Sequence, residues 1–450
     1  MSRITYLFLI ILILPTSFLT AQFDTLGVKL SYFHTSAVEN FQPHYLHSNH
    51  WGLVEFNKQS QNILSGHFLA NYQLGEKFNS KIELDLVSND FNYNFLQQGY
   101  AETSFDRKLA FFFGYKAYTL GMPPTSLSSG SLALSNNARP LPKIGIGIPE
   151  YIEVPFTFGY LEIKGMLAHG WFEKNRVIES PYLHEKSFFF RAGGNLPFRF
   201  KGGLTHFAHW GGTTNGVELP GSFEDYLKVF FVQPGSIEDE NLPGEAANVL
   251  GNHLGTIEFG AELDLMGFKI DAYHQTPYED NTGTKRFWRK NRDRLLGFHI
   301  KQNHLTFIKN IVYEYIYTKQ QSGEGLNIPD GGRDNYYNNY LYLTGWTYRN
   351  RILGTPLFLS EHQTRTYNPE FINPDNFDFS VLNNRIIAHH FGLEGDINKT
   401  IKYKLLSTYT ENYGNYGGIN GGMNKWGSRD PNYNFDYYFD PPRKQWYFLL

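Results

Sequence analysis

The sequence predicts an all-β fold, an antiparallel transmembrane β-barrel of about 16 to 18 strands with long loops at one end. Three observations lead to this fold class: alternating apolar and charged residues, a secretory signal, and an uneven distribution of turns and loops. In residues 256–265 the odd positions are apolar and most even positions carry carboxylates. Because successive strand side chains point to opposite faces, one face suits lipid and the other suits a wet or plugged lumen. The same alternation occurs in residues 80–86, 109–117, 161–167, 188–192, 296–301 and 401–409.

The N-terminus has the layout of a cleavable secretory signal. Arg3 precedes the uncharged apolar run 6–14, and small or polar residues then lead to Ala21. A basic start, an apolar stretch and a small residue at the cleavage site are the parts of such a signal, and this run is too short to be favoured as a spanning helix. We therefore expect residues 1–21 to be a signal peptide and residues 22–450 to form a single outer-membrane β-barrel domain.

Composition narrows the function classes. The chain has 450 residues, no Cys, and 17% aromatic residues, mostly its 39 Phe and 31 Tyr. Aromatic rings at both membrane–water interfaces are typical of barrels, whereas a mean hydropathy of −0.41 is too polar for a helical membrane protein. The absence of Cys excludes a disulfide framework and a lipidated Cys after the signal. The net charge of −3 gives no support for nucleic-acid binding.

Tight turns and long loops are expected at opposite ends of the barrel. Turns are predicted at 75–77, 106–107, 266–268 and 303–304, each between two alternating stretches. In outer-membrane barrels short turns lie on the periplasmic rim and long loops lie outside the cell. The expected long loops, rich in Gly, Pro and Asn, are 121–150, 211–253, 320–340, 349–383 and 413–442.

One segment within the second of these loops has the signature of a short helix. Ser222 and Asp225 have the spacing of a capping box, and the mostly apolar run 226–231 follows. We expect this loop helix to fold into the lumen or over the mouth of the barrel. Residues 27–56, in contrast, are predicted to be extended chain.

No group of residues indicates catalysis. The sequence contains neither the G-x-S-x-G nor the H-E-x-x-H motif. His47 and His50 are spaced so that, on a strand, they would face opposite sides of the sheet, and the same holds for His389 and His390. We expect no enzymatic activity, no cofactor and no metal site.

Aromatic residues and amides are interleaved in two of the long loops. Residues 334–340 read Asp-Asn-Tyr-Tyr-Asn-Asn-Tyr, and 413–438 has the same character. Flat rings stack on sugar faces, and amides and carboxylates hydrogen-bond to hydroxyls, so this combination suits a glycan surface. An aromatic girdle with turn-forming Asn is the alternative interpretation. The candidate ring platforms and hydroxyl partners are Tyr336, Tyr337, Trp346, Trp426, Asp334, Asn338 and Asn339.

Short motifs share their order and spacing with those of a known family. They are residues 182–186 with Arg191, 203–206, 210–212, 225–231, 251–255, 334–339, 345–348, 354–356, 383–386 with His389 and His390, and 412–414. Taken together they resemble the Wzi-like capsule-assembly proteins, particularly the branch found in Bacteroidetes-type bacteria. The resemblance implies an 18-stranded outer-membrane barrel that binds surface polysaccharide, helps to assemble a capsule and has no enzymatic activity. Better-known members carry helical elements near the N-terminus, where this sequence predicts extended chain.

Two functions from different classes remain open at this point. The leading one is a non-enzymatic, lectin-like barrel whose partners are capsular or exopolysaccharide and outer-membrane lipid, with no nucleic acid and with a monomer favoured. The alternative is an outer-membrane porin for passive or substrate-selective diffusion. Charged residues expected to line its pore are Glu83, Asp85, Glu258, Glu262, Lys164, Arg191 and Lys201.

Overall fold

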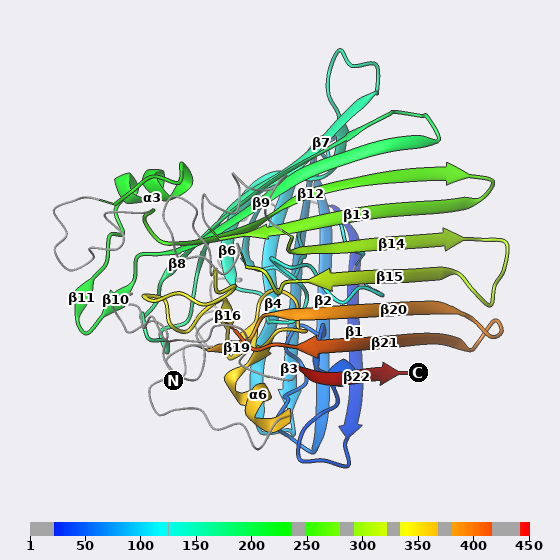
Figure 1. The fold of residues 1–450 in the computed structure, drawn as a ribbon. Helices are drawn as coiled ribbons and strands as arrows, with labels where there is room; N and C mark the ends of the chain where they lie inside the picture. The colour runs from blue at the N-terminus through cyan, green and yellow to red at the C-terminus, as the bar shows by residue number, and fades with distance from the viewer. Residues whose placement is uncertain are drawn as a thin grey trace.

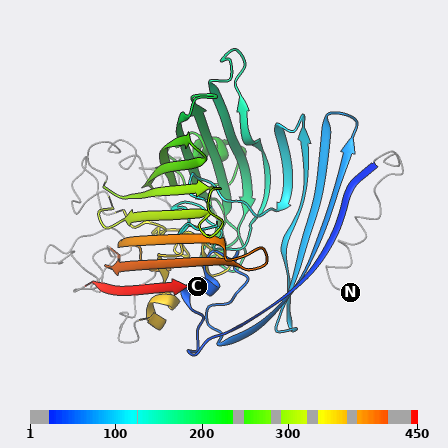
Figure 2. The ribbon, with the colours of Figure 1, turned by 90° about the vertical axis from the view of Figure 1, so that its right-hand side faces the viewer.

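The computed structural model describes residues 22–124, 126–235, 249–279, 292–321, 334–367, 380–415 and 442–450. Sixteen strands form one antiparallel sheet in which neighbours in the sheet follow one another along the chain. The sheet curls around an interior that other segments occupy (Figures 1 and 2). Within the described residues, β1 and β22 are the two ends of the sheet. The predicted fold class is therefore confirmed.

The strands of this sheet are β1 (Gln22–Ser36), β2 (Ser60–Leu74), β3 (Phe78–Asn89), β4 (Tyr93–Phe105), β5 (Leu109–Tyr115), β6 (Pro142–Glu153), β7 (Leu161–Trp171), β8 (Tyr182–Ala192), β9 (Phe198–Trp210), β12 (Asn252–Leu265), β13 (Phe268–Tyr278), β14 (Arg294–Gln302), β15 (Asn310–Tyr317), β20 (Ile386–Asp396), β21 (Lys402–Asn412) and β22 (Arg443–Leu449). Two-stranded sheets form from β10 (Thr213–Thr214) with β11 (Val217–Glu218), β16 (Thr347–Tyr348) with β17 (Arg351–Ile352), and β18 (Leu359–Ser360) with β19 (Val381–Asn383). The helices are α2 (His44–His47), α3 (Phe223–Phe230) and α6 (Glu361–Tyr367). In the part of the chain that the structure describes, no helix is long and apolar enough to span a membrane.

The alternation predicted from the sequence sets the two faces of the wall. On β12, Glu258 is 0% exposed and accepts a hydrogen bond inside the barrel, whereas Leu265 is 50% exposed on the outer face. The adjacent His389 and His390 also point to opposite faces. His390 is buried inside the barrel, and His389 is exposed on the outer face, where Tyr313 contacts it. The period of two therefore predicted correctly which side chains point into the lumen.

Connections between strands are short at one end of the sheet and mostly long at the other (Figure 1). At the turn end the shortest connection is 266–267, and none is longer than 154–160. At the loop end only 90–92 is as short, and 318–385 is the longest connection. Outward-facing rings form a belt at the turn end, where the rings of Phe78 and Phe105 lie 5.2 Å apart. Such a belt marks one membrane–water interface.

Several sequence-based boundaries were wrong. Residues 27–56 are not extended throughout, because β1 ends at Ser36 and the helix α2 follows. His47 lies on α2 rather than on a strand, and its Nδ1 contacts the carbonyl oxygen of Pro43, one helical turn back. The end of the expected loop 121–150 is strand β6, and its alternating Ile and Gly residues pair with β7.

The loop helix is present where it was predicted, but it does not enter the lumen. The Oγ of Ser222 accepts a hydrogen bond from the backbone N–H of Asp225, and the Asp225 carboxylate accepts one from the backbone N–H of Ser222, so α3 begins with a capping box. Its ring Tyr226 packs 5.7 Å from the ring of Trp210, on the outer face of the wall. The prediction of the helix is confirmed, but its expected place in the lumen or over the mouth of the barrel was wrong.

Candidate functional site

Three long connections from the loop end fold back into the barrel, and we call them together the plug. They comprise residues 37–59, residues 116–141 apart from Thr125, and residues 334–367. Their apolar side chains join inward-facing wall residues in one continuous core. Members of this core include Tyr45, Leu127, Leu132, Trp346 and Phe358 from the plug, and Phe207, Leu254, Val312 and Ile316 from the wall.

Buried carboxylates of the wall hold the plug in place. Glu314 on β15 accepts hydrogen bonds from the Oγ of Ser128 at 2.6 Å and from the backbone N–H of Ser129 at 2.8 Å. Glu258 on β12 accepts one from the backbone N–H of Met122 at 2.7 Å. Both carboxylates are 0% exposed. Hydrogen bonds to a carboxylate are about twice as strong as neutral ones, so these contacts fix Met122, Ser128 and Ser129 against the wall.

The plug segments are also bonded to one another. Trp346 donates its Nε1–H to the carbonyl oxygen of Ala133 at 2.6 Å, and Asn137 donates to the carbonyl oxygen of Ile352 at 2.8 Å. Arg351 donates to the carbonyl oxygen of His47, which connects the third segment to the first. These hydrogen bonds join the three segments into a single packed body inside the barrel.

Burial also lowers the pKa values of two plug residues, His44 and Arg351. Desolvation, with a smaller contribution from His390, lowers the pKa of His44 from 6.5 to about 3, and its ring stacks on Tyr447 at 4.2 Å. Desolvation, with the nearby Arg139, lowers the pKa of Arg351 to about 10. At neutral pH His44 is thus neutral and Arg351 is charged.

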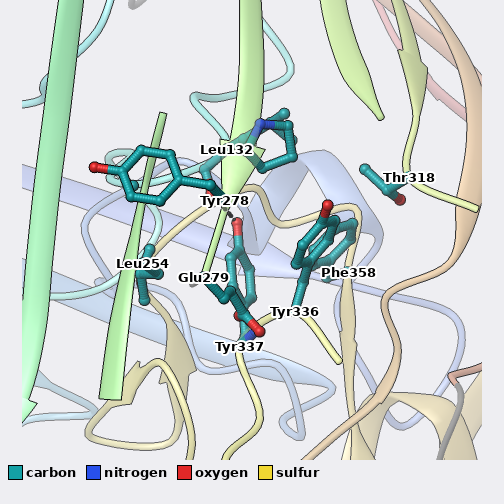
Figure 3. Close-up of a pocket in the computed structure, with 10 residues that line it drawn as sticks. Leu132, Leu254, Tyr278, Glu279, Thr318, Tyr336, Tyr337 and Phe358 are labelled. Carbon is teal, nitrogen blue, oxygen red and sulfur yellow. Dashed lines mark hydrogen bonds between the residues drawn. The ribbon is translucent and has the colours of Figure 1, made fainter. Parts of the chain in front are cut away.

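The three described rings that were predicted to bind sugar lie inside the plug. Tyr336 and Tyr337 are 2% and 3% exposed, and Trp346 is 0% exposed. Tyr336 donates its hydroxyl hydrogen to Asp293 at 2.8 Å, and the hydroxyl of Tyr337 donates to the carbonyl of Leu132. Both rings line a narrow crevice that admits only a water-sized guest (Figure 3). These rings present no open face for a sugar, and their role in binding stays a prediction.

The predicted hydroxyl partners mainly shape the backbone around those rings. Asn338 donates to the carbonyl oxygen of Val381 at 2.8 Å, and the Oδ1 of Asn339 accepts from the backbone N–H of Leu341 at 2.8 Å. Asp334 lies half-buried at the start of the segment and donates its backbone N–H to Gln321. Trp426 lies outside the described residues. The structure thus brings the other six candidates together in one segment, 334–346.

A second group of rings and arginines lies at the loop end, and we call it the rim patch: Tyr93, Phe95, Arg139, Tyr348 and Arg349. Tyr93 and Arg349 are exposed, Phe95 is half-buried, and Arg139 and Tyr348 are buried beneath them. The Arg139 guanidinium lies 3.5 Å from the ring centroid of Phe95, and Arg349 lies 5.6 Å from that of Tyr348. Tyr93 is 42% exposed and Arg349 is exposed. The pKa of Arg139 is lowered by burial and, to a lesser degree, by the charge of Arg349.

The two guanidinium groups of the rim patch form no direct ion pair with the described acidic residues. Within the described ranges, no carboxylate oxygen lies within 4.0 Å of the Arg139 or Arg349 guanidinium nitrogens. Glu173 instead accepts from the backbone N–H of Arg349 at 3.0 Å. The sequence analysis missed this patch, although residues 88–95 interleave rings with Asn and Asp in the same manner as 334–340.

One group of side chains has the composition of a metal site. His67, Glu83 and Asp85 on the inner face of β2 and β3 bring one ligand atom each within 4.8 Å of one another. However, Lys81 lies 2.6 Å from Glu83, and Gln98 donates to both carboxylates. Protein donors already contact both carboxylates, so we interpret the group as a hydrogen-bonded network.

The fold and the filled lumen define a plugged β-barrel of the outer-membrane class. The family model of the capsule assembly protein Wzi matches residues 41–367. This is more than half of the chain, so the chain belongs to that family, as the motifs predicted. The match does not test the Bacteroidetes-type branch.

Solved structures that match this chain include the following three proteins. Wzi of Escherichia coli, described as a carbohydrate-binding β-barrel involved in group 1 capsule assembly, is 15% identical, with 89% of this chain and 82% of that chain covered and a TM-score of 0.47. OmpT of Vibrio cholerae is 8% identical, with 95% and 98% covered and a TM-score of 0.38. A mutant porin of Rh. blastica is 6% identical, with 87% and 95% covered and a TM-score of 0.35. The comparison with curated proteins gave no match.

Proposed function

We propose that this chain is a non-enzymatic outer-membrane barrel that binds a surface polysaccharide and supports capsule or exopolysaccharide assembly. The observation that carries the proposal is the family match, because residues 41–367 include nearly all of the plug and the whole rim patch. Short turns mark the periplasmic end of such barrels, so the loop end with its rim patch faces the outside of the cell. A polymer at the cell surface meets this end first.

The rim patch has the chemistry that a polysaccharide needs. The ring of Tyr93 offers a flat face for a sugar ring, and the guanidinium of Arg349 offers several N–H donors for hydroxyl or carboxylate oxygens. Single contacts of this kind are weak, but a repeating polymer engages many barrels at once, so that the weak contacts add through multivalency. In this proposal the buried Tyr336, Tyr337 and Trp346 act as positioning residues that hold the plug beneath the patch.

Replacing Tyr93 and Arg349 together with alanine is expected to release polysaccharide from cells. Each lost contact is worth about 1 kcal/mol, so the affinity of one site falls roughly tenfold or more. The measurement is the ratio of cell-associated to released polymer. The matched control is the double variant Tyr160→Ala and Arg107→Ala, which removes an exposed ring and an arginine from the turn end. A wild-type amount of cell-associated polymer in the Tyr93/Arg349 variant, with the barrel still heat-modifiable, would exclude the rim patch as the binding surface.

A porin is the second candidate, because charged residues line the lumen toward the turn end. Arg191 forms a bidentate pair with Glu162 at 2.6 and 2.8 Å, and Lys201 lies 2.6 Å from Asp271. These groups face the lumen as predicted. The plug, however, occupies the same lumen nearer the loop end, and a conducting path must pass through it.

Conductance in planar bilayers separates the two functions. We expect the wild-type protein to pass little or no steady current, because wall carboxylates hold the plug by hydrogen bonds at 2.6–2.8 Å. A general porin reconstituted in parallel is the positive control for insertion. Regular ohmic steps from the wild-type protein would favour the porin.

A further inference from the structure

Helix α3 lies against the outer wall of the barrel, on the side that faces lipid. Glu185 and Phe207 point into the lumen, where Glu185 pairs with Lys143 at 2.6 Å and the ring of Phe207 lies 5.3 Å from Trp346. Their strand neighbours must therefore point outward. Two of these neighbours are His184 and Ala208, and Trp210, three residues after Phe207, points outward by the same alternation. All three contact α3 or share its buried cluster.

The surface of α3 divides into three sectors. The first faces the wall: Val229 is 0% exposed, and Tyr226 and Phe230 pack on His184 with ring centroids 5.6 and 5.4 Å apart. The second is polar and contains Glu224, Asp225 and Lys228, with Lys228 lying 3.2 Å from Glu224. The third is apolar and faces away from the protein.

This third sector is the unusual one, and we call it the apolar stripe: Phe223, Leu227 and Phe231. The three side chains recur every four residues and so lie along one side of the helix and its C-cap. Their exposed fractions are 75%, 38% and 62%. A water-facing helix surface carries polar side chains at such positions, so the stripe indicates an apolar neighbour.

The position of α3 along the strands matches the expected edge of the apolar band, where the membrane interface lies. An apolar band about 25 Å tall, on strands that rise about 3.3 Å per residue at a tilt of about 40°, spans roughly ten residues. Phe198 is 55% exposed at the turn end of β9 and so belongs to the belt, and ten residues along β9 from it lies Ala208. Ala208 belongs to the buried cluster beneath α3, together with Trp210 and Val229. The helix therefore lies where the hydrocarbon of the outer leaflet meets its headgroups.

We propose that α3 is an interfacial helix whose apolar stripe binds the acyl chains of the outer leaflet. The stripe continues the apolar outer face of the wall, where Leu204 and Phe200 are 39% and 41% exposed. Its polar sector then lies toward headgroups and water, as in helices that lie flat in a membrane interface. This inference rests on the membrane-spanning fold and not on polysaccharide binding, so each can fail without the other.

The stripe also has a mechanical consequence for the loop that contains it. Lys186 donates a hydrogen bond to the carbonyl oxygen of Phe230 and lies 4.3 Å from the Phe230 ring centroid, which fixes the C-terminal end of α3 to β8. Lipid on the opposite side completes the burial of the helix. The described part of the connection after β9 is thus held at the membrane surface beside the barrel mouth instead of over it.

The absence of Cys from the chain allows a direct test by single labelling. Variants Phe223→Cys and Leu227→Cys, with Glu224→Cys as the matched polar control and Leu204→Cys as the control for lipid exposure, are labelled with the fluorophore NBD. Each is reconstituted in liposomes that contain phospholipid spin-labelled near the headgroup end of the acyl chain, near its methyl end, or on the headgroup. Heat-modifiable mobility on gels verifies that every variant is folded.

Fluorophores at 223 and 227 are expected to be quenched by the shallow acyl label about twofold or more above the control at 224, and less by the deep label, because interfacial helices sink about 5–10 Å. Aqueous iodide should quench the fluorophore at 224 more than the one at 223. Equal acyl-chain quenching at 223 and 224 would overturn the proposal, and so would strong iodide quenching at 223. Protection of 223 from both quenchers would also overturn it, since that result indicates a protein partner or a second copy of the chain.

Discussion

Replacing Glu314 with alanine is expected to release the middle plug segment and turn a closed barrel into a leaky one. In the wild-type protein this buried carboxylate accepts hydrogen bonds from Ser128, Ser129 and the hydroxyl of Tyr273, the last at 2.7 Å. Alanine leaves these donors buried without an acceptor, and each such donor costs about 1–3 kcal/mol. Opening the segment to water satisfies the donors, so the open state gains population. Current steps in planar bilayers, absent from the wild-type protein, are the expected result.

Two comparisons test whether the leak comes from the plug. Glu314→Gln keeps an acceptor oxygen of the same reach, so we expect a smaller leak than with alanine. Glu162→Ala removes a lumen carboxylate that pairs with Arg191 on the wall, and this variant should remain closed. An unchanged, closed barrel in Glu314→Ala, or an equal leak in Glu162→Ala, would show that the contacts of Glu314 do not hold the plug.

The barrel wall could be predicted from the sequence because its signal is local. A strand that separates lipid from lumen repeats every two residues, so ten residues such as 256–265 are enough to assign both faces. The capping box at Ser222 is local in the same sense, and α3 begins there. Each of these features depends on neighbours within a few positions along the chain.

The plug could not be predicted, because its contacts join distant positions. Ser129 and Glu314 are 185 positions apart, and no pattern near either residue indicates the other. The hydroxyls of the Ser-rich segment 126–135 look in sequence like those of an exposed loop. The structure shows instead that they satisfy buried groups, as when Ser135 donates to the carbonyl oxygen of Gly354 at 2.6 Å.

The candidate site illustrates the same difference. The sequence predicted that Tyr336, Tyr337 and Trp346 belong together, and the structure places all three in one packed segment. The same aromatic residue type can stack on a glycan when it is exposed or fill a core when it is buried, however, and the sequence does not show which. The order of rings and amides predicted a glycan surface or an aromatic girdle, and only the fold distinguishes the buried rings from the exposed ring of Tyr93.

The second large effect is expected from a charge placed on the outer wall, and its size should depend on depth. Phe259 pairs with Gly202 on β9, four residues from Phe198 in the turn-end belt, and so lies near the middle of the apolar band. Leu265 points to the same face but pairs with Phe268 beside the turn. An arginine costs about 2–4 kcal/mol at the middle of the bilayer and about 0–1 kcal/mol near the interface.

We therefore expect Phe259→Arg to lower the free energy of unfolding in lipid vesicles by several times more than Leu265→Arg, as measured by denaturant titration with heat-modifiable mobility as the readout. Phe259→Leu keeps the site apolar and separates the effect of the charge from the loss of the ring, whose centroid lies 6.3 Å from that of Phe200. In detergent micelles, which adapt to a charged side chain more readily than a bilayer does, the gap between the two arginine variants should narrow. Equal destabilisation by both arginines in vesicles would mean that depth is irrelevant, and this face of β12 would then not be in contact with lipid.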